Sequence, residues 1–410
     1  METPNSTEQV KVPQTLLGQI IGQEDAVRIV RLAAKSGRHL LLVGQPGCGK
    51  SMLGQALSQL IPPSNLGDMI SCPNEHEPTR PQIKLVMAGG AKLQLQASKP
   101  QNSRLFILMF ISFLIGALIW WAKEYFSALD GKVAGAIYTA LFSITGLSFL
   151  AYLFISWKPS GQGECVALLS RKKGEPAPFI DATGAPVASL LGDIQHDPYQ
   201  TGGLGTPPHK RVQLGLIHRA HGGVLFIDEI GTFPLNVQQE LLTALQEGEF
   251  PVLGRNETSA GAGVRTDPVP CKFILVAAGN IDSVHSIHPA LRDRIRGYGY
   301  EILMKDEMED NGQNHRKLWQ FIAQEVKRDR QIPHFSAAAA AEVIRQAHAI
   351  CGRKNKLTLR LRLLGGIIRA AGDLALWESA KEVQEKHVRA GAKISLGIED
   401  QILSAKLVKR

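Results

Sequence analysis

The sequence predicts an α/β fold in which helices surround a largely parallel β-sheet, with a smaller helical domain after it. A buried strand at His39–Val43 runs directly into a glycine-rich turn, and an apolar pattern at residues 52–60 then opens a helix. Two further apolar strands follow, at residues 223–229 and 273–278, and polar side chains stand at their ends. Strands separated by helical patterns favour a parallel sheet.

Composition gives the broad class of the protein. The chain has 410 residues, of which 44% are hydrophobic and 20% charged, so it can bury a core and is too apolar for a disordered chain. The net charge of +9 permits contact with anionic lipid, nucleic acid or nucleotide without choosing among them. Five cysteines without a Cys-x-x-Cys pair argue against a disulfide framework and a structural zinc site, and favour a reducing compartment. Residues 1–10 lack the apolar core of an export signal.

The glycine-rich turn carries a phosphate-binding motif. It reads Gly44-Gln45-Pro46-Gly47-Cys48-Gly49-Lys50-Ser51, the pattern G-x-x-x-x-G-K-[ST] between a strand and a helix. Glycines let backbone N–H groups turn inward around phosphates, and the following helix N-terminus adds a favourable dipole. Lys50 is expected to reach the outer phosphates and Ser51 a magnesium ion, so the expected ligands are ATP and Mg²⁺. Cys48 suggests a redox switch, but a small residue at a tolerant position is the simpler interpretation.

The two later strands end in side chains that suit nucleotide hydrolysis. Asp228 fits the role of holding magnesium, and Glu229 fits the base that orients the attacking water. An apolar strand that ends in Asp-Glu is common and indicates little by itself. Together with a phosphate loop earlier in the sequence, it indicates a site of nucleotide hydrolysis. Asn280, after the third strand, can hold the attacking water or the γ-phosphate, although asparagine there is usually a turn residue.

Two long apolar runs separate the phosphate-loop helix from the second strand. Residues 105–122 are uncharged, and residues 133–157 contain no ionisable side chain other than tyrosines. Each is close to the roughly twenty residues that a helix needs to cross a bilayer. Buried soluble helices are the alternative, but these usually keep a polar stripe or run shorter. We therefore expect a two-helix transmembrane hairpin inserted at residues 100–158.

The charges that flank the runs predict how the hairpin is oriented. Basic residues stand on both outer flanks: Lys99, Arg104, Lys158, Arg171, Lys172 and Lys173. The segment between the runs, residues 123–132, is short and roughly charge-balanced. Positive charge favours the cytosolic side. We expect a protein of the cell membrane, in contact with lipid, with both termini and the nucleotide site in the cytoplasm.

Taken together, these residues resemble the AAA+ ATPase fold, an αβα P-loop sandwich with a C-terminal helical lid. Residues 21–27 resemble the family's G-Q motif, which implies that Ile21 and Gly22 lie beside the adenine. Asn280 matches the sensor 1 position. Residues 288–296 resemble the segment with the arginine finger, which serves the nucleotide of a neighbouring subunit. The resemblance therefore implies a homo-oligomeric ring, expected to be a hexamer.

Two arginines are candidates for the arginine finger. Arg294, which follows Asp293, is our choice, and Arg292 is the second candidate. A fixed guanidinium matches the charge that spreads over phosphate oxygens in the transition state. The alternative is a solvated cluster of charges, since four charged residues fall within five positions.

The lid contains the sensor 2 candidates. The pattern at residues 357–362 is expected to open a helix that continues through residues 365–369, and its spacing favours Arg362 over Arg360. The lid is basic: Arg353, Lys354, Lys356, Arg360, Arg362 and Arg369. No aromatic side chains interleave these charges, so we expect no nucleic acid as a partner.

More closely, the chain resembles the membrane-anchored archaeal-type LonB proteases, from Gly22 to about His387. The inserted hairpin and four runs carry the likeness: FIDATGA (residues 179–185), LLGD (190–193), HDPYQTGGLGTP (196–207) and IHRAH (217–221). It implies an ATPase that acts on protein substrates within an ATP-dependent serine protease. The family's proteolytic domain, with its serine and lysine dyad, is not expected here, because residues 388–410 are too few to fold it. A Lon-type protease domain is thus an expected partner.

Further candidate residues flank the second strand on both sides. The glycine-rich stretch at residues 192–208 implies a loop facing the central pore of the ring, with Tyr199 gripping the polypeptide because its ring packs against many side chains. A surface loop is the alternative, and a second pore loop is expected within residues 254–267. Acidic and histidine side chains crowd this region without a common ligand spacing, so no metal besides magnesium is expected: Asp193, His196, Asp197, His209, His218 and His221.

The predicted organisation has five segments: residues 1–99 and 159–311 form the AAA+ α/β subdomain, 100–158 the hairpin, 312–387 the lid, and 388–410 a C-terminal segment. The expected function is ATP hydrolysis that drives unfolding and translocation of proteins at the cytosolic membrane face. The main alternative is an AAA+ chaperone or chelatase-like remodelling ATPase without proteolysis. A nucleotide-binding scaffold and a nucleic-acid motor are weaker alternatives.

Overall fold

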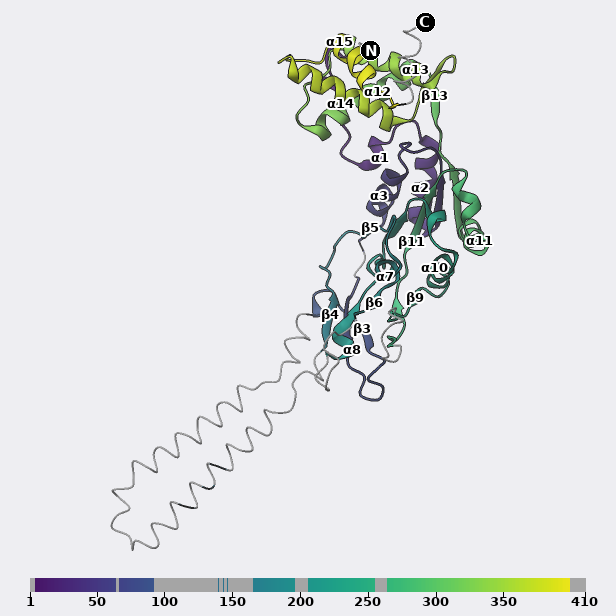
Figure 1. The fold of residues 1–410 in the computed structure, drawn as a ribbon, viewed down its shortest axis with the longest axis vertical. Helices are drawn as coiled ribbons and strands as arrows, with labels where there is room; N and C mark the ends of the chain where they lie inside the picture. The colour runs from purple at the N-terminus through teal and green to yellow at the C-terminus, as the bar shows by residue number, and fades with distance from the viewer. Residues whose placement is uncertain are drawn as a thin grey trace, which may run out of the picture.

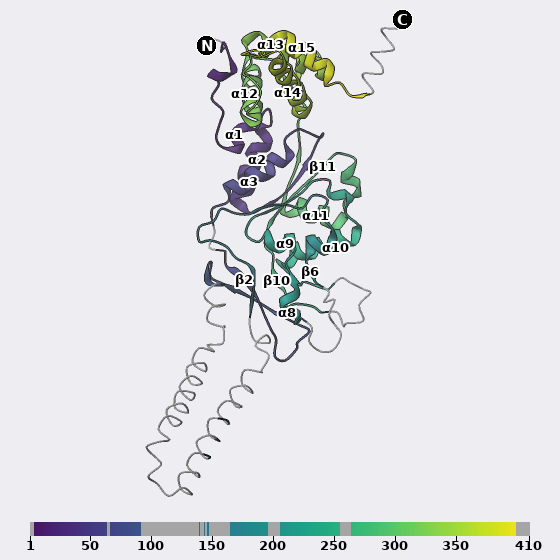
Figure 2. The same ribbon diagram turned by 60° about the vertical axis from the view of Figure 1, so that its left-hand side comes forward.

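The computed structural model describes residues 4–63, 66–91, 139, 143, 146, 165–195, 206–254 and 264–398 of the chain. Figures 1 and 2 show three parts along the long axis of the molecule, a helical lid, a central α/β part and a small antiparallel sheet. The two views agree that the central part lies between the other two.

A five-stranded parallel sheet forms the central part. Its strands stand in the order β12 (Gly299–Leu303), β1 (His39–Val43), β11 (Ile274–Gly279), β8 (Val224–Ile227) and β5 (Phe179–Asp181). All neighbouring pairs are parallel, and Val43 pairs with Gly279. The carboxyl ends of these strands therefore meet at one edge. The three predicted strands are confirmed, the first with the same ends and the others with small shifts.

Helices cover both faces of this sheet. On one face lie α2 (Glu24–Ser36) and α3 (Lys50–Leu60), and on the other α10 (Leu235–Glu247) and α11 (Pro289–Tyr298) (Figure 1). Side chains along β1 alternate between these faces: Leu40 and Leu42 pack with α2 and α3, and Leu41 packs with α10 and α11. A strand buried on both faces reads as a continuous apolar run, which explains the sequence HLLLV.

The lid has its own core. It contains α12 (Gly312–Asp329), α13 (Ala337–Cys351), α14 (Leu361–Trp377) and α15 (Glu385–Ile394). An antiparallel pair of strands, β13 (Glu307–Glu309) and β14 (Lys356–Thr358), lies between the sheet and these helices. The expectation that residues 357–362 open a helix is therefore wrong for its first residues. Lys356–Thr358 instead pair with β13 as strand β14, in which Leu357 and Thr358 are both buried, and the helix begins at Leu361.

The N-terminal segment lies against the lid. Its short 3-10 helix η1 (Thr7–Gln9) is joined to the segment before α13, because the Thr7 N–H donates to the Phe335 carbonyl at 3.0 Å and the Phe335 N–H donates to Thr7 Oγ1 at 2.9 Å. The chain then passes through α1 (Leu16–Gln19) into α2.

Shorter elements connect these parts. They are α7 (Val187–Leu191), β6 (Asp193–Ile194), α8 (Pro208–Arg211), β7 (Val212–Gln213), α9 (Leu216–Arg219), η3 (Ile230–Thr232), β9 (Glu249–Phe250), β10 (Val269–Pro270) and η4 (Ser283–Ser286). The pairs β6–β7 and β9–β10 are antiparallel.

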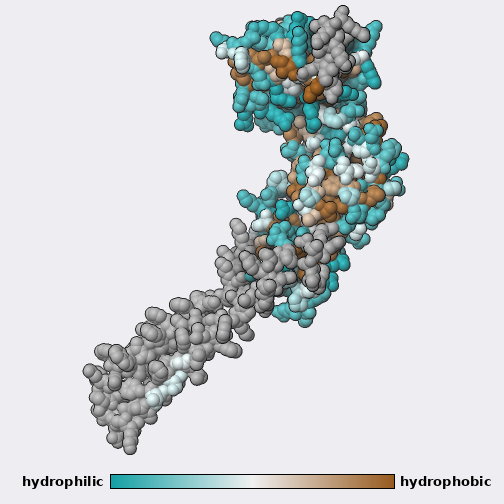
Figure 3. All heavy atoms as spheres, in the orientation of Figure 1, coloured by the Kyte–Doolittle hydropathy of each residue, from teal (hydrophilic) through white to brown (hydrophobic). Residues whose placement is uncertain are grey.

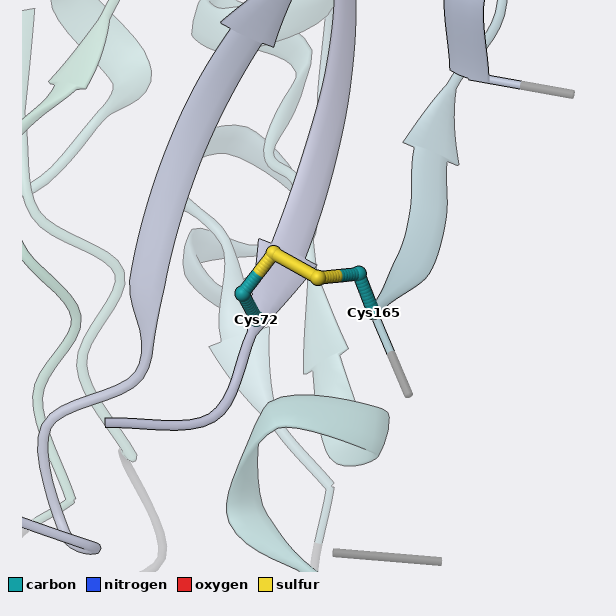
Figure 4. Close-up of a disulfide and its surroundings, with 2 residues drawn as sticks. All are labelled: Cys72 and Cys165. Carbon is teal, nitrogen blue, oxygen red and sulfur yellow. A yellow bond between two sulfur atoms is a disulfide. The ribbon is translucent and has the colours of Figure 1, made fainter. Parts of the chain in front are cut away.

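The small sheet corrects one expectation. Its strands β3 (Gln82–Val86), β2 (Asp68–Cys72) and β4 (Val166–Leu169) are antiparallel in that order. A disulfide joins Cys72 to Cys165 (Figure 4), so the expectation that the cysteines form no disulfide is wrong. The cysteines are 93 residues apart, but Ser71 pairs with Val166, and this register places the next pair, Cys72 and Cys165, opposite each other. Their spacing in the sequence carries no trace of this pairing.

The predicted hairpin stays a prediction. Both apolar runs lie outside the described residues, apart from Thr139, Ser143 and Gly146. Over the part of the chain that the structure describes, none of the helices combines the length and the apolar character needed to cross a bilayer. In the face shown in Figure 3, hydrophilic residues cover much of the lid and of the α/β part, with smaller hydrophobic groups between them.

Candidate nucleotide-binding site

A cavity of about 1270 Å³ lies where the phosphate loop, the carboxyl edge of the sheet, the N-terminal segment and the lid meet. Its walls bring together residues from distant parts of the sequence. They include Leu16, Ile20, Ile21, Pro46, Gly47, Cys48, Gly49, Lys50, Ser51, Asp181, Asp228, Glu229, Phe321, Gln324, Glu325, Leu361, Arg362 and Arg369. Apolar residues from α1 and the lid stand on some walls, and phosphate-loop and acidic residues stand on others, as a nucleotide with an apolar base and charged phosphates requires.

The phosphate loop needs its glycines. Gly47 and Gly49 have φ values of 85° and 94°, a region that disfavours side chains, and α3 begins directly after Gly49. A Cβ atom added to Gly47 would lie 2.6 Å from Cβ of Arg362. The first turn of α14 therefore lies directly on the phosphate loop, which places the lid in contact with the site.

Lys50 links the loop to the neighbouring strands. Its side chain is 7% exposed, and its ammonium group donates to the carbonyls of Gly44 at 3.0 Å and Gly279 at 3.1 Å. The Asp228 carboxylate lies 3.8 Å away. The ends of β1, β11 and β8 thus converge on one ammonium group, as expected from the parallel register.

The carboxylates at the end of β8 differ in how they are fixed. The Asp228 N–H donates to Thr183 Oγ1 at 2.9 Å, and Asp228 Oδ1 accepts from the Glu229 N–H at 3.0 Å. Glu229 has a φ of 52°, which is uncommon for a residue other than glycine and typical of functional sites. Its side chain is exposed in the cavity wall and makes no hydrogen bond or ion pair to the described residues. Glu229 is therefore free to act on a bound water or substrate.

Asn280 lies just outside the cavity wall. Its Oδ1 accepts from the Ser283 N–H at 2.7 Å, which is a turn contact, and its neighbour Gly279 accepts from Lys50. The side chain is exposed at the same edge of the sheet as the carboxylates. The turn and the sensor interpretations of this residue are thus compatible.

The two finger candidates on α11 are in different surroundings. Arg292 pairs with Glu301, with 3.0 Å between its Nε and the carboxylate, and this hydrogen bond raises the pKa of Arg292. The guanidinium of Arg294 lies over the ring of Tyr298, 3.9 Å from its centroid. Its Nε is buried and has no hydrogen-bond partner in the described chain. Among the described residues that line the cavity, neither arginine occurs.

The two sensor 2 candidates differ in their position relative to the cavity. Arg362 lines the cavity beside Gly47, whereas Arg360 precedes α14 and is not among the described lining residues. A third arginine of the lid, Arg369, lines the cavity too, and its guanidinium contacts the buried Glu325 at 2.6 Å.

Burial accounts for two residues that were considered for other roles, His218 as a metal ligand and Cys48 as a redox switch. Burial lowers the pKa of His218 to about 4, its Nε2 lies 2.8 Å from the Phe250 carbonyl, and its Nδ1 accepts from the Gly215 N–H. Burial raises the pKa of the Cys48 thiol, so it stays protonated, which disfavours a redox switch. The pore candidate Tyr199 and most of the second pore loop, residues 255–263, lie outside the described residues.

Sequence reasoning missed two residues at this site. Asp181 ends β5 and lines the cavity beside the carboxylates, and Thr183 accepts the Asp228 N–H. The signal for Asp181 was present, because FID at residues 179–181 is another apolar strand that ends in an acid. Thr183 acts through its hydroxyl on a backbone group, which no sequence pattern reports.

Magnesium fits the donors in this wall. Ser51 and Asp228 both line the cavity and offer a hydroxyl and a carboxylate oxygen, the donor types that Mg²⁺ uses beside phosphates.

The sheet order, the phosphate loop after β1, the acids after β8 and the lid over the cavity define a P-loop ATPase of the AAA+ class. A family model described as "Archaeal LonB, AAA+ ATPase LID domain" matches residues 334–393, and one described as "Magnesium chelatase, subunit ChlI" matches residues 16–82. The chain is 48% identical over 402 residues to the archaeal Lon protease of Thermococcus kodakarensis and 45% identical over 406 residues to that of Thermoplasma acidophilum. It is 36% identical over 451 residues to a Lon protease homologue of Thermoplasma volcanium.

The chain belongs to the archaeal Lon protease family and corresponds to its AAA+ ATPase part. These alignments cover 97% of this chain in each case. They cover 62%, 60% and 90% of the three relatives, respectively, so the chain spans about three-fifths of the first two. A solved structure of NtrX from Brucella abortus in complex with ADP is similar with a TM-score of 0.45 at 12% identity, over 97% of this chain and 60% of that chain.

Proposed function

We propose that the chain hydrolyses ATP to unfold and translocate protein substrates for a Lon-type protease domain. The proposal is carried by one observation: Lys50, Glu229 and Arg362, from three distant segments of the chain, line the same cavity. Membership of the archaeal Lon family supports the link to proteolysis.

In this mechanism the chain's own groups divide the work. Lys50 and Arg362 neutralise phosphate charge, the loop glycines Gly47 and Gly49 turn backbone N–H groups toward it, and Glu229 orients and deprotonates the attacking water. Gly44 begins the loop, and its N–H donates to the Gly279 carbonyl at 3.0 Å. Ser51 and Asp228 would hold Mg²⁺, which would supply positive charge to offset that of the phosphates. Asn280 contributes an amide at the edge of the sheet, and Ile21 and Gly22 border the adenine.

The remaining charge comes from a neighbouring subunit. We assign the finger to Arg294 and not to Arg292, because Arg292 is already engaged by Glu301. Neither lies at its own subunit's cavity, so the finger acts in trans, which requires a homo-oligomer, proposed to be a hexameric ring. Tyr199 is proposed to grip the substrate in its pore.

The test compares Glu229→Gln with the parent chain. Both should bind ATP with Mg²⁺ equally well, measured by calorimetry, and turnover of the variant should fall by about 10²–10⁴-fold because the base is lost. Glu247→Gln, an exposed glutamate on α10, is the matched control and should retain parental turnover. Equal turnover of Glu229→Gln and the parent would rule out this base.

We also propose that the protein is anchored in the cell membrane by residues 105–122 and 133–157, with the ATPase in the cytoplasm. The length and lack of charge of both runs support this proposal. The test is fractionation of cells that express the chain, followed by alkaline carbonate washing. The proposal expects the chain to stay in the membrane pellet, and release into the supernatant would contradict it.

A further inference from the structure

The last turn of α11 brings Arg294 and Tyr298 into contact. Both residues belong to α11, four positions apart, so their side chains lie on the same face of the helix. Tyr298 is 52% exposed, so it does not fill a core. Its described contact is instead the guanidinium of Arg294, 3.9 Å above its centroid.

The surroundings of Arg294 lack a competing anion. Its Nε is buried without a hydrogen-bond partner in the described chain, and no carboxylate of the described residues pairs with it. Burial is the main cause that lowers the pKa of His39 to about 4, and the nearby positive charge of Arg294 is the second cause. The imidazole of His39 therefore stays neutral. Arg292, two residues away, is instead tied to Glu301. The ring of Tyr298 therefore fixes an arginine that would otherwise have many rotamers.

An aromatic ring suits an arginine that must bind a phosphate. A carboxylate partner would occupy the N–H donors and offset the charge, whereas a ring holds the flat face of the guanidinium and leaves the donors at its edge available. Phosphate oxygens are bound by those edge donors.

We propose that Tyr298 is a positioning residue for ATP hydrolysis in the neighbouring subunit, because its ring presents the Arg294 guanidinium to that subunit's phosphates. This inference rests on the proposed function, in which Arg294 is the finger. Tyr298 itself touches neither nucleotide nor water in this account, and its effect passes entirely through Arg294.

The experiment is a double-mutant cycle on the assembled chain. Steady-state ATP turnover is measured for the parent, Tyr298→Leu, Arg294→Ala and the double variant. Tyr298→Leu should lower kcat by about tenfold without changing the KM for ATP, since a misplaced catalytic group slows chemistry but the subunit's own cavity is intact. In the Arg294→Ala background, Tyr298→Leu should have no further effect on kcat.

Two controls separate positioning from folding. Tyr298→Phe keeps the ring and should restore most of the parental kcat, and Arg296→Ala removes an exposed guanidinium from the same helix and should leave turnover unchanged. The oligomeric mass of every variant is measured, and Tyr298→Ala replaces Tyr298→Leu if the latter fails to assemble.

The outcomes distinguish this inference from the function on which it rests. A parental kcat for Tyr298→Leu, an equal loss in the Arg294→Ala background, or a Tyr298→Phe variant as slow as Tyr298→Leu would each overturn the positioning role. A parental kcat for Arg294→Ala would instead overturn the assignment of the finger.

Discussion

The cavity and helix α11 present the same kinds of charged side chain in opposite situations. In the cavity, Lys50 contacts two carbonyls and lies near Asp228, and Arg369 contacts Glu325, so these two cations are fixed by groups of the same subunit. On α11, Arg294 has an aromatic ring as its described partner and points to no phosphate site of its own chain. The difference teaches that Arg294 is fixed without an anion of the described chain, which suits the role in a neighbouring subunit's site that we propose for it.

The largest expected effect tests the α11 side of this comparison. Arg294→Ala should lower kcat for ATP by about 10³-fold, because an arginine finger supplies charge stabilisation only in the transition state. The affinity for ATP should stay close to that of the parent, since the subunit's own cavity is unaltered. Turnover and calorimetric binding measured together check both parts. A variant that loses binding as well as turnover would place Arg294 in its own subunit's site and break the comparison.

The second prediction tests the cavity side. Arg362→Ala should weaken ATP binding by about 10- to 100-fold, since one charged hydrogen bond to phosphate is lost. Arg360→Ala is the matched control, because Arg360 lies two residues away and is not among the described lining residues. Titration of each variant with ATP and Mg²⁺ measures the effect. If Arg360→Ala proved the weaker binder, the lid residue assigned to the phosphates would have to change.

A smaller effect is expected from the hydroxyl that holds the Asp228 backbone. Thr183→Val should reduce turnover by about three- to tenfold, because one neutral hydrogen bond to the Asp228 N–H is lost. Thr243→Val, on the exposed face of α10, removes a hydroxyl far from the acids and serves as the control. Steady-state turnover of the two variants decides the matter. Equal rates for both variants would show that Thr183 does not orient the carboxylates.

The last prediction concerns a residue that belongs to neither region. The folded-state pKa of His218 is about 4 and its unfolded value is near 6.5, so the folded state binds fewer protons in this window. The stability from burying the neutral ring is complete above pH 6.5 and is lost as the pH falls toward 4. His218→Gln should reduce this loss by up to about 3 kcal/mol, with unchanged turnover at neutral pH. Urea midpoints measured from pH 4 to 7 check it, and identical slopes for parent and variant would contradict it.

The sequence was informative where one short segment carries both structure and chemistry. The strand at His39–Val43, the loop that follows it and the acids after β8 could be predicted because apolar runs and functional residues are contiguous there. The Cys72–Cys165 disulfide and the Thr183 contact could not, because strand register and the approach of distant segments create them. The start of α14 was misjudged because the buried residues Leu357 and Leu359 fit a strand as well as a helix.

The most direct test of the account mixes two inactive chains. Glu229→Gln lacks the base but keeps Arg294, and Arg294→Ala lacks the finger but keeps Glu229. If each site is completed by a neighbour, allowing the two variants to exchange subunits should restore ATP turnover well above the sum of the separate rates. A mixture that shows the presence of both chains in one assembly, but no gain in turnover, would contradict a site shared between subunits.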